Sequence, residues 1–261
     1  MPFYKLFVVD GIINISAFSY SMITRFIEVG FFPGFIVWLP LGYYLSIIYF
    51  LSYIFILLPM CSIFVIALNR FTSAYFGLMY DKFWKKHLIK FIVCVLFTPC
   101  LFSWHILFSQ AYWSPLNGRG FAMDYTKNIT WMSNSRSVMI VSTFTMVMGA
   151  IFCVATIHRI RFIPSEAMRI VEKRLILITT VMTTSLLGQF MVATCFQFNR
   201  ILWEFRKETY NWLFVMRPFA ADISNLAPAW IIHFLDKNIA YNKENSSQNS
   251  SKMLVRHANV R

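Results

Sequence analysis

The sequence predicts an all-α membrane protein, built as a multi-pass bundle of transmembrane helices. The 261 residues are 58% hydrophobic and only 13% charged, whereas about a quarter of the residues in a soluble domain carry a charge. No Asp, Glu, Lys or Arg occurs between Glu28 and Arg70. As one helix this stretch would be roughly 60 Å long, twice the ~30 Å hydrocarbon core of a bilayer, so it must contain a turn and a long spanning helix.

Six apolar runs are long enough to cross a bilayer, and each ends where polar or turn-forming residues begin. Residues 30–34, Gly-Phe-Phe-Pro-Gly, are typical of a turn, and Pro40 suits the first turn of the next helix. Ser165 before Glu166 is typical of a helix start, so we expect the fifth helix to begin outside the hydrocarbon core. The expected spans are 3–26, 41–68, 88–110, 138–157, 175–198 and 212–235.

The basic residues predict how the bundle is oriented. About two thirds of the 24 Lys and Arg residues fall in segments on the same side as Arg70, and positively charged segments stay in the cytoplasm. Arg70, both termini and the polar tail 236–261, which we expect to be disordered, are therefore predicted to be cytoplasmic. The polar loop 111–135 is then outside, and its Asn128-Ile129-Thr130 sequon predicts glycosylation at Asn128.

Several function classes find no support in the sequence. The net charge of +13 is spread over short segments between spans, whereas a nucleic-acid-binding protein gathers its basic residues on one folded face. All five cysteines lie within apolar runs, which predicts no disulfide framework. We find no catalytic motif and no metal-ligand or cofactor motif, so we expect no enzymatic activity, metal or cofactor. The inverted repeats common in transporters are not seen either.

Ionisable and aromatic residues inside the expected spans are candidates for a ligand site, because such groups tend to face a bundle interior or a cavity. Arg217 lies about two turns below the outer surface, where it would either bind an acidic or carbonyl-bearing ligand or extend toward the outer interface. For His105 the alternative to a ligand contact is packing. Tyr49 and Tyr53 share one helical face with Ser46, which predicts that this face lines the bundle. The ligand-binding candidates are Arg217, His105, Trp104, Tyr49, Tyr53 and Gln189.

A second group of polar residues falls at similar depths in the first and last spans. Asp10 and Asn14 lie four residues apart on one helical face. Asp222 and Asn225 lie on the last span, and at about 1.5 Å per residue Asn225 reaches nearly the depth of Asp10. We expect these four residues to form an intramembrane polar cluster, either a static interhelical contact or a switch that hinges at Pro228.

Four short motifs at matching positions along the chain resemble those of one family. They are Phe3-Tyr4-Lys5-Leu6-Phe7 with Asp10 and Asn14, Leu68-Asn69-Arg70-Phe71-Thr72, Glu172-Lys173-Arg174-Leu175, and Asp222-Ile223-Ser224-Asn225-Leu226. This set resembles the nematode serpentine receptors of class gamma, which are chemosensory receptors of the seven-helix, G-protein-coupled type. The six expected spans correspond to helices two to seven of that family, and its first helix has no counterpart in the chain.

The resemblance implies a chemosensory receptor embedded in the lipid bilayer, in the plasma or ciliary membrane of sensory neurons. It would bind a small molecule or pheromone from the outer side and signal through a heterotrimeric G protein. Asn69 replaces the acidic residue that precedes this arginine in rhodopsin-like receptors. Arg70 therefore lacks that local charge partner, and we do not expect it to form the rhodopsin-type lock. The coupling candidates, which would contact a G protein or anionic lipid, are Asn69, Arg70, Arg159, Arg161, Lys173 and Arg174.

Two alternatives stay open at the level of the sequence. In the first, the chain is a small multi-pass transporter or channel subunit. In the second, it is a truncated receptor relative that does not signal.

Overall fold

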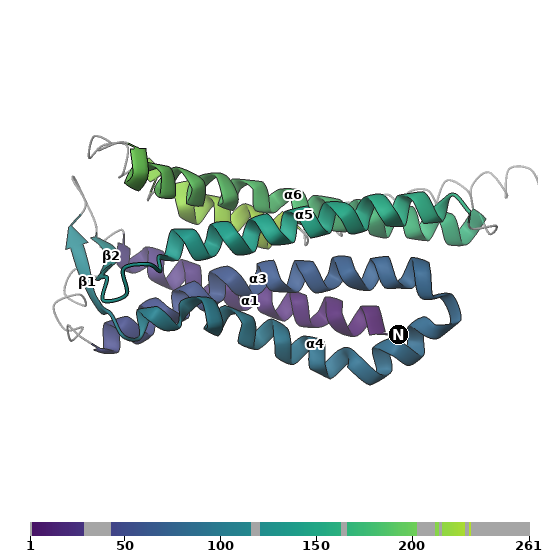
Figure 1. Cartoon of the computed structure of the whole chain (residues 1–261), viewed down its shortest axis with the longest axis horizontal. Coiled ribbons are helices and arrows are strands. Elements are labelled where there is room, and N and C mark those ends of the chain that lie inside the picture. The colour runs from purple at the N-terminus through teal and green to yellow at the C-terminus, as the bar shows by residue number, and fades with distance from the viewer. Residues whose placement is uncertain are drawn as a thin grey trace, which may run out of the picture.

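The computed structural model describes residues 2–28, 43–115, 121–162, 166–202, 212–213, 216–227 and 230. Residues 216–227 are helical. Two short 3-10 turns, η1 (Gly77–Met79) and η2 (Trp104–Ile106), flank the helix over residues 80–103. Five long helices lie roughly along one axis (Figure 1): α1 (Pro2–Glu28), α3 (Tyr43–Phe76), α4 (Tyr80–Ser103), α5 (Asn134–Ile160) and α6 (Glu166–Leu202).

All five long helices are apolar enough to cross a membrane, which confirms the predicted multi-pass helical bundle. The sixth expected span, 212–235, is helical at 212–213, 216–227 and 230, and the rest of it lies outside the described residues. The expected turn at 30–34 and the tail 236–261 also lie outside them. The start of α6 at Glu166 agrees with the helix start predicted from Ser165 and Glu166.

Helix α3 is the central element of the bundle. In its most apolar window 56% of the residues are buried inside the protein, against 28–33% in the other four long helices. It packs against α1, α4, α5 and α6, and a helix with neighbours on all sides needs an almost continuously apolar sequence. Ser46, Tyr49 and Tyr53 are all buried, which confirms that their shared face lines the bundle.

The helix ends differ from the expected spans where polar residues are buried. The hydropathy pattern predicts that the second span ends at 68, but α3 continues to Phe76. It does so because Asn69, Arg70 and Thr72 are buried among neighbouring helices instead of meeting water. The chain turns at Gly77, whose φ of 50° lies in the left-handed region that glycine adopts at low cost. Helix α4 then begins at Tyr80, well before the predicted residue 88.

Two strands occupy part of the segment predicted as a polar loop over 111–135. Strand β1 (Gln110–Pro115) pairs antiparallel with β2 (Phe121–Thr126), in a register that places Tyr112 opposite Asp124. The negative charge of Asp124 raises the pKa of the Tyr112 phenol, and partial burial of the phenol adds to the shift. Helix α4 correspondingly ends at Ser103, before residue 110, where the third expected span ends.

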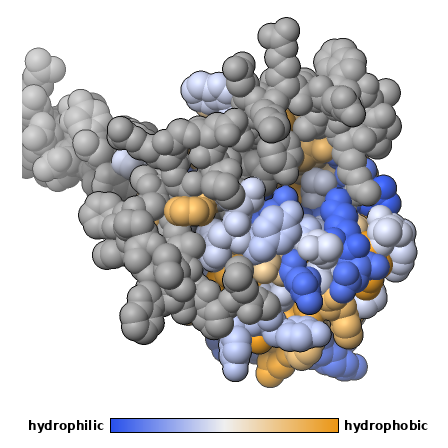
Figure 2. Space-filling model, turned by 90° about the vertical axis from the view of Figure 1, so that its left-hand side faces the viewer, coloured by the Kyte–Doolittle hydropathy of each residue, from blue (hydrophilic) through white to orange (hydrophobic). Residues whose placement is uncertain are grey.

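The strand pair is fastened to α3 by one side chain. The Ser46 hydroxyl donates a hydrogen bond to the Ser109 carbonyl at 2.6 Å and accepts one from the Ala111 amide at 3.1 Å. The strands thereby cover the end of the bundle opposite Arg70 (Figure 1). Hydrophilic side chains gather on the described part of this face (Figure 2), as expected of a surface in contact with water rather than lipid.

Helices α5 and α6 approach each other closely at Gly149. A Cβ atom at this position would lie 2.8 Å from Cγ2 and 3.0 Å from Oγ1 of Thr183. Thr183 has little freedom to withdraw, because its hydroxyl donates to the Thr179 carbonyl at 2.9 Å within its own helix. Glycine at 149 therefore lets the two helices pack backbone against side chain, as small residues do in membrane bundles.

We expect Gly149→Ala to lower the melting temperature of the protein in detergent micelles, with a loss of about 1–3 kcal/mol, because the added methyl overpacks the α5–α6 contact. Gly188→Ala is the matched control, since its Cβ would meet Ala220 at an ordinary 3.6 Å. Adding Thr183→Ala should restore the stability lost in Gly149→Ala. Equal losses in the two glycine variants would contradict the proposed close contact.

Candidate functional site

A cavity of about 350 Å³ lies at the end of the bundle that the strands cover. The strand pair and the segment after it contribute Asp124, Tyr125, Lys127 and Ser133, and the start of α5 contributes Asn134 and Ser135. The helices contribute Tyr49, Tyr53, Ile56, Gln189, Val192, Ala193, Phe196 and Arg217. Four of the six predicted ligand-binding residues therefore meet in one cavity of a size that suits a small molecule: Arg217, Tyr49, Tyr53 and Gln189.

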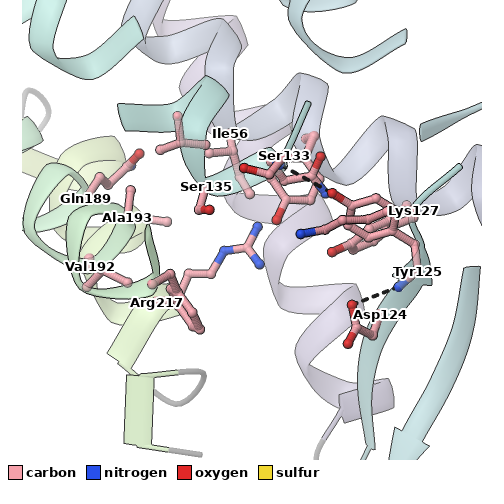
Figure 3. A pocket seen from close by; sticks show the side chains of 17 residues that line it. Ile56, Asp124, Tyr125, Lys127, Ser133, Ser135, Gln189, Val192, Ala193 and Arg217 are labelled. Atoms are coloured by element: carbon pink, nitrogen blue, oxygen red, sulfur yellow. Dashed lines mark hydrogen bonds between the residues drawn. The ribbon is translucent and has the colours of Figure 1, made fainter. Parts of the chain in front are cut away.

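Two cationic side chains point into the cavity (Figure 3). The Arg217 guanidinium lies over the Tyr53 ring, 4.7 Å from its centroid. The Lys127 ammonium lies 6.0 Å from the centroid of the Tyr125 ring. Asp124 is the acidic residue of the described lining, and it accepts a hydrogen bond from the Tyr125 amide at 2.8 Å. The ionisable side chains of this lining therefore carry more positive than negative charge.

The structure places His105 and Trp104 outside the described lining of this cavity. His105 is buried, and its Nε2 lies 2.8 Å from Oδ1 of Asn134. Its ring also lies 6.2 Å from that of Tyr125. Trp104 is 38% exposed and packs edge-on against Phe108. His105 therefore positions two residues of the cavity wall, which corresponds to the packing alternative.

Sequence reasoning missed the contribution of the strand pair to the cavity. Asp124, Tyr125 and Lys127 lie in the segment predicted as a loop, so they were not among the candidates. A usable signal was present: Asn117-Gly118 lies between two short segments rich in aromatic residues, and this dipeptide is the strongest short-range indicator of a hairpin. No local signal identifies Ser133, Asn134 and Ser135, which line the cavity because α5 begins there.

A smaller cavity of about 90 Å³ adjoins the first. The two share Tyr49, Ile56, Gln189, Arg217 and Ala221 in their linings. Oε1 of Gln189 and Oδ1 of Asn225 are buried with no hydrogen-bond partner among the described residues. Both residues line the smaller cavity, so it presents hydrogen-bond acceptors that need a donor.

The predicted polar cluster is divided in the structure. Asp10 accepts a hydrogen bond from the Ser62 hydroxyl at 2.5 Å, and the Asn14 amide donates to the Asp10 carbonyl at 3.0 Å. In the described part of the chain, no hydrogen bond joins either residue to Asp222 or Asn225. Asp10 therefore links α1 to α3 instead of linking α1 to the last span.

Asp222 forms an ion pair with Arg25, which lies in the last turn of α1. The Nη1–Oδ2 distance is 2.5 Å, and the side chains are only 20% and 16% exposed. Arg25 also donates to the Pro218 carbonyl at 2.8 Å and lies over the Phe219 ring. This pair fastens the helical segment 216–227, which carries Arg217, to α1.

At the opposite end of the bundle, Arg70 is almost fully buried, at 5% exposure. Asn69 and Tyr80 hydrogen-bond through their side chains at 3.0 and 3.1 Å, and the Trp84 indole donates to Thr72 at 2.8 Å. The Glu172 carboxylate of α6 interacts electrostatically with Arg70. An acid distant in the sequence thus provides the negative charge that Asn69 does not.

The other predicted coupling residues of this end are exposed: Arg159, Arg161, Lys173 and Arg174. The Arg159 guanidinium lies 6.0 Å from the centroid of the Tyr75 ring. Asn128, at the strand-covered end, is exposed and donates to the Phe108 carbonyl. Its glycosylation stays a prediction. Within the described residues, no group of His, Cys, Asp or Glu side chains is arranged to hold a metal ion.

A bundle of membrane-length helices with a polar cavity at one end defines a serpentine integral membrane protein. The sequence model of a protein family, described as Srg family chemoreceptor, matches residues 1–241 of the chain. The chain belongs to this family of receptors, which confirms the resemblance seen in its motifs.

The relatives with known names are serpentine receptors of class gamma from Caenorhabditis elegans. Class gamma-11 is 27% identical over 67% of this chain and 50% of its own length. Class gamma-14 is 26% identical over 97% of this chain and 77% of its own length. The chain therefore spans about half of the first relative and about three quarters of the second.

We expect Asp222→Asn to lower the melting temperature in micelles, because it leaves the Arg25 guanidinium buried beside a neutral group, at a cost of about 1–3 kcal/mol. Removing both charges, in Arg25→Gln with Asp222→Asn, should cost less than the single change. Asp81→Asn, at an exposed position, is the control. A single change no more harmful than Asp81→Asn would show that the ion pair contributes nothing.

Proposed function

We propose that the chain is a chemosensory receptor that binds a small molecule with an anionic group in the cavity of about 350 Å³. It signals through a heterotrimeric G protein at the opposite end, which the distribution of basic residues predicts to be cytoplasmic. As part of this proposal, it acts in the plasma or ciliary membrane of sensory neurons. The observation that carries it is the convergence of Arg217 and Lys127 on one cavity (Figure 3).

The charges of the cavity support an anionic ligand. Two cations that face the same space repel each other, and an anion between them turns this repulsion into two attractions. Hydrogen bonds between ionised partners contribute about 1.5–3 kcal/mol each. The rings of Tyr49, Tyr53 and Phe196 line the same cavity, so they offer apolar surface to the rest of the ligand.

Two helices connect the cavity with the opposite end. Helix α3 carries Tyr49 and Tyr53 in the cavity and Arg70 at its other end. Helix α6 carries Gln189 in the cavity and Glu172 beside Arg70. A ligand that shifts α6 relative to α3 would therefore change the electrostatic interaction between Glu172 and Arg70.

The burial of Arg70 sets a condition for coupling. At 5% exposure its guanidinium is out of reach of a soluble partner, so the elements that bury it must move before a G protein contacts it. We infer that the ligand favours the conformation in which Arg70 is exposed, and a ligand acts in this way only by binding that conformation more tightly.

Ligand binding is tested in cells that express the receptor with a G-protein reporter, challenged with small-molecule fractions of nematode-conditioned medium. We expect Arg217→Gln and Lys127→Gln each to raise the half-maximal concentration of an active fraction about 10- to 100-fold, because each removes a charged hydrogen bond. Arg136→Gln removes an exposed cation near the same end and should change little.

If Arg136→Gln raised the half-maximal concentration as much as Arg217→Gln and Lys127→Gln, the effect would come from surface charge. That result would contradict an anion in the cavity. A flux of substrate or ions through the protein without G protein would instead favour a transporter or channel subunit.

G-protein coupling is tested with the purified chain in nanodiscs, by measuring nucleotide exchange on an added G protein. We expect Arg70→Ala to abolish the exchange stimulated by an active fraction, and Glu172→Gln to raise the basal exchange, because Arg70 loses its electrostatic partner. Asp81→Asn, an acid on the same side of the bundle that is exposed, is the control. Full stimulated exchange in Arg70→Ala would show that the coupling role of Arg70 is wrong.

A further inference from the structure

We propose that a groove between α5 and α6, at the end of the bundle near Arg70, binds an anionic phospholipid. The groove has a volume of about 490 Å³. Its lining consists of Ile157, Ile160, Arg161, Lys173, Ile176, Leu177 and Thr180. The inference depends neither on the ligand in the outer cavity nor on the G protein.

The lining is divided into a charged end and an apolar floor. Arg161 follows the last residue of α5, and Lys173 lies on α6; both are exposed. Ile160 and Ile176 are buried, at 3% and 7% exposure, and form the floor. A phosphate group and an acyl chain need these two environments side by side.

The groove is also of a suitable depth and position. From Lys173 to Thr180, α6 rises about 10 Å at 1.5 Å per residue. Ile157 and Leu177, on the two sides of the groove, are 45% and 49% exposed. Both belong to helices of membrane length, so the apolar part of the groove opens toward the hydrocarbon and its charged end lies near the headgroups.

Charge complementarity selects an anionic headgroup. The described lining contains two cations and no acidic residue. Glu172, next to Lys173 in the sequence, interacts with Arg70 on α3 instead. Basic pockets between transmembrane helices on the cytoplasmic side are a recognised form of site for anionic lipid headgroups, and the distribution of Lys and Arg places this end in the cytoplasm. A zwitterionic lipid would gain much less from the same two cations.

A lipid in this position would bridge the two helices. Arg161 and Lys173 lie on either side of the connection between α5 and α6, and one phosphate within reach of both would hold the helix ends together. Because Glu172 precedes Lys173, the lipid and the electrostatic interaction with Arg70 act on the same turn of α6.

The test is native mass spectrometry of the full chain released from detergent, titrated with phosphatidylserine or with phosphatidylcholine of the same acyl chains. We expect phosphatidylserine to bind more tightly, and Arg161→Gln with Lys173→Gln to weaken it about 30-fold, from about fivefold per basic side chain. Lys85→Gln with Lys86→Gln removes the same charge from exposed positions on α4 and should leave the affinity unchanged. The soluble headgroup glycerophosphoserine should not compete.

Four results would overturn the proposal. Equal weakening in the Lys85 and Lys86 variant would show a diffuse charge effect. Equal binding of phosphatidylcholine would show an ordinary lipid shell. Competition by glycerophosphoserine at the same concentration would show that the apolar floor is not used. Displacement of the lipid by formation of a dimer would assign the groove to a second copy of the chain.

Discussion

The structure depends on one constraint of the bilayer: a polar atom inside it needs a partner from the protein, because the hydrocarbon offers none. Polar side chains of helix α3 provide such partners for most of the elements packed against it. Ser46 fastens the strand pair, Ser62 binds Asp10 of α1, and Asn69 and Thr72 bind Tyr80 and Trp84 of α4. The polar residues of α3 thus hold the surrounding elements at defined heights, while its apolar residues fill the core.

The same arrangement connects the cavity with the end of the bundle that holds Arg70. Tyr49 and Tyr53 belong to the cavity, and Arg70 lies at the far end of the same helix. Helix α6 runs parallel to this connection, from Gln189 to Glu172. The ion pair between Arg25 and Asp222 fixes the segment that carries Arg217, so the cation of the cavity is held from the α1 side. Positions near both ends therefore belong to a few rigid elements, which is the physical requirement for coupling two distant sites.

Hydropathy was sufficient to predict the spans, because lipid selects for long apolar runs whatever their neighbours are. Helical spacing was sufficient for the shared face of Tyr49 and Tyr53. The partner of Asp222 was beyond such reasoning, since Arg25 is separated from it by most of the chain and no local pattern links the two. The strand pair was missed because short strands leave a weak alternation, and Asp124, Tyr125 and Lys127 of the cavity lining were missed with it. The depth of His105 left both a packing role and a ligand contact open, whereas its bond to Asn134 depends on the tertiary packing.

The origin of the cavity walls has an evolutionary consequence. One wall comes from the strand pair and the segment after it, which contribute Asp124, Tyr125 and Lys127, and the other comes from membrane helices. Asp124 and Lys127 lie outside the hydrophobic core, so substitutions at these two positions would alter the chemistry of the first wall and leave the core contacts of Met123 and Tyr125 in place. Under the proposed function, a gene family built on this plan can diversify what its members recognise while its membrane architecture stays under separate selection, and relatives 26–27% identical to the chain are compatible with such a history.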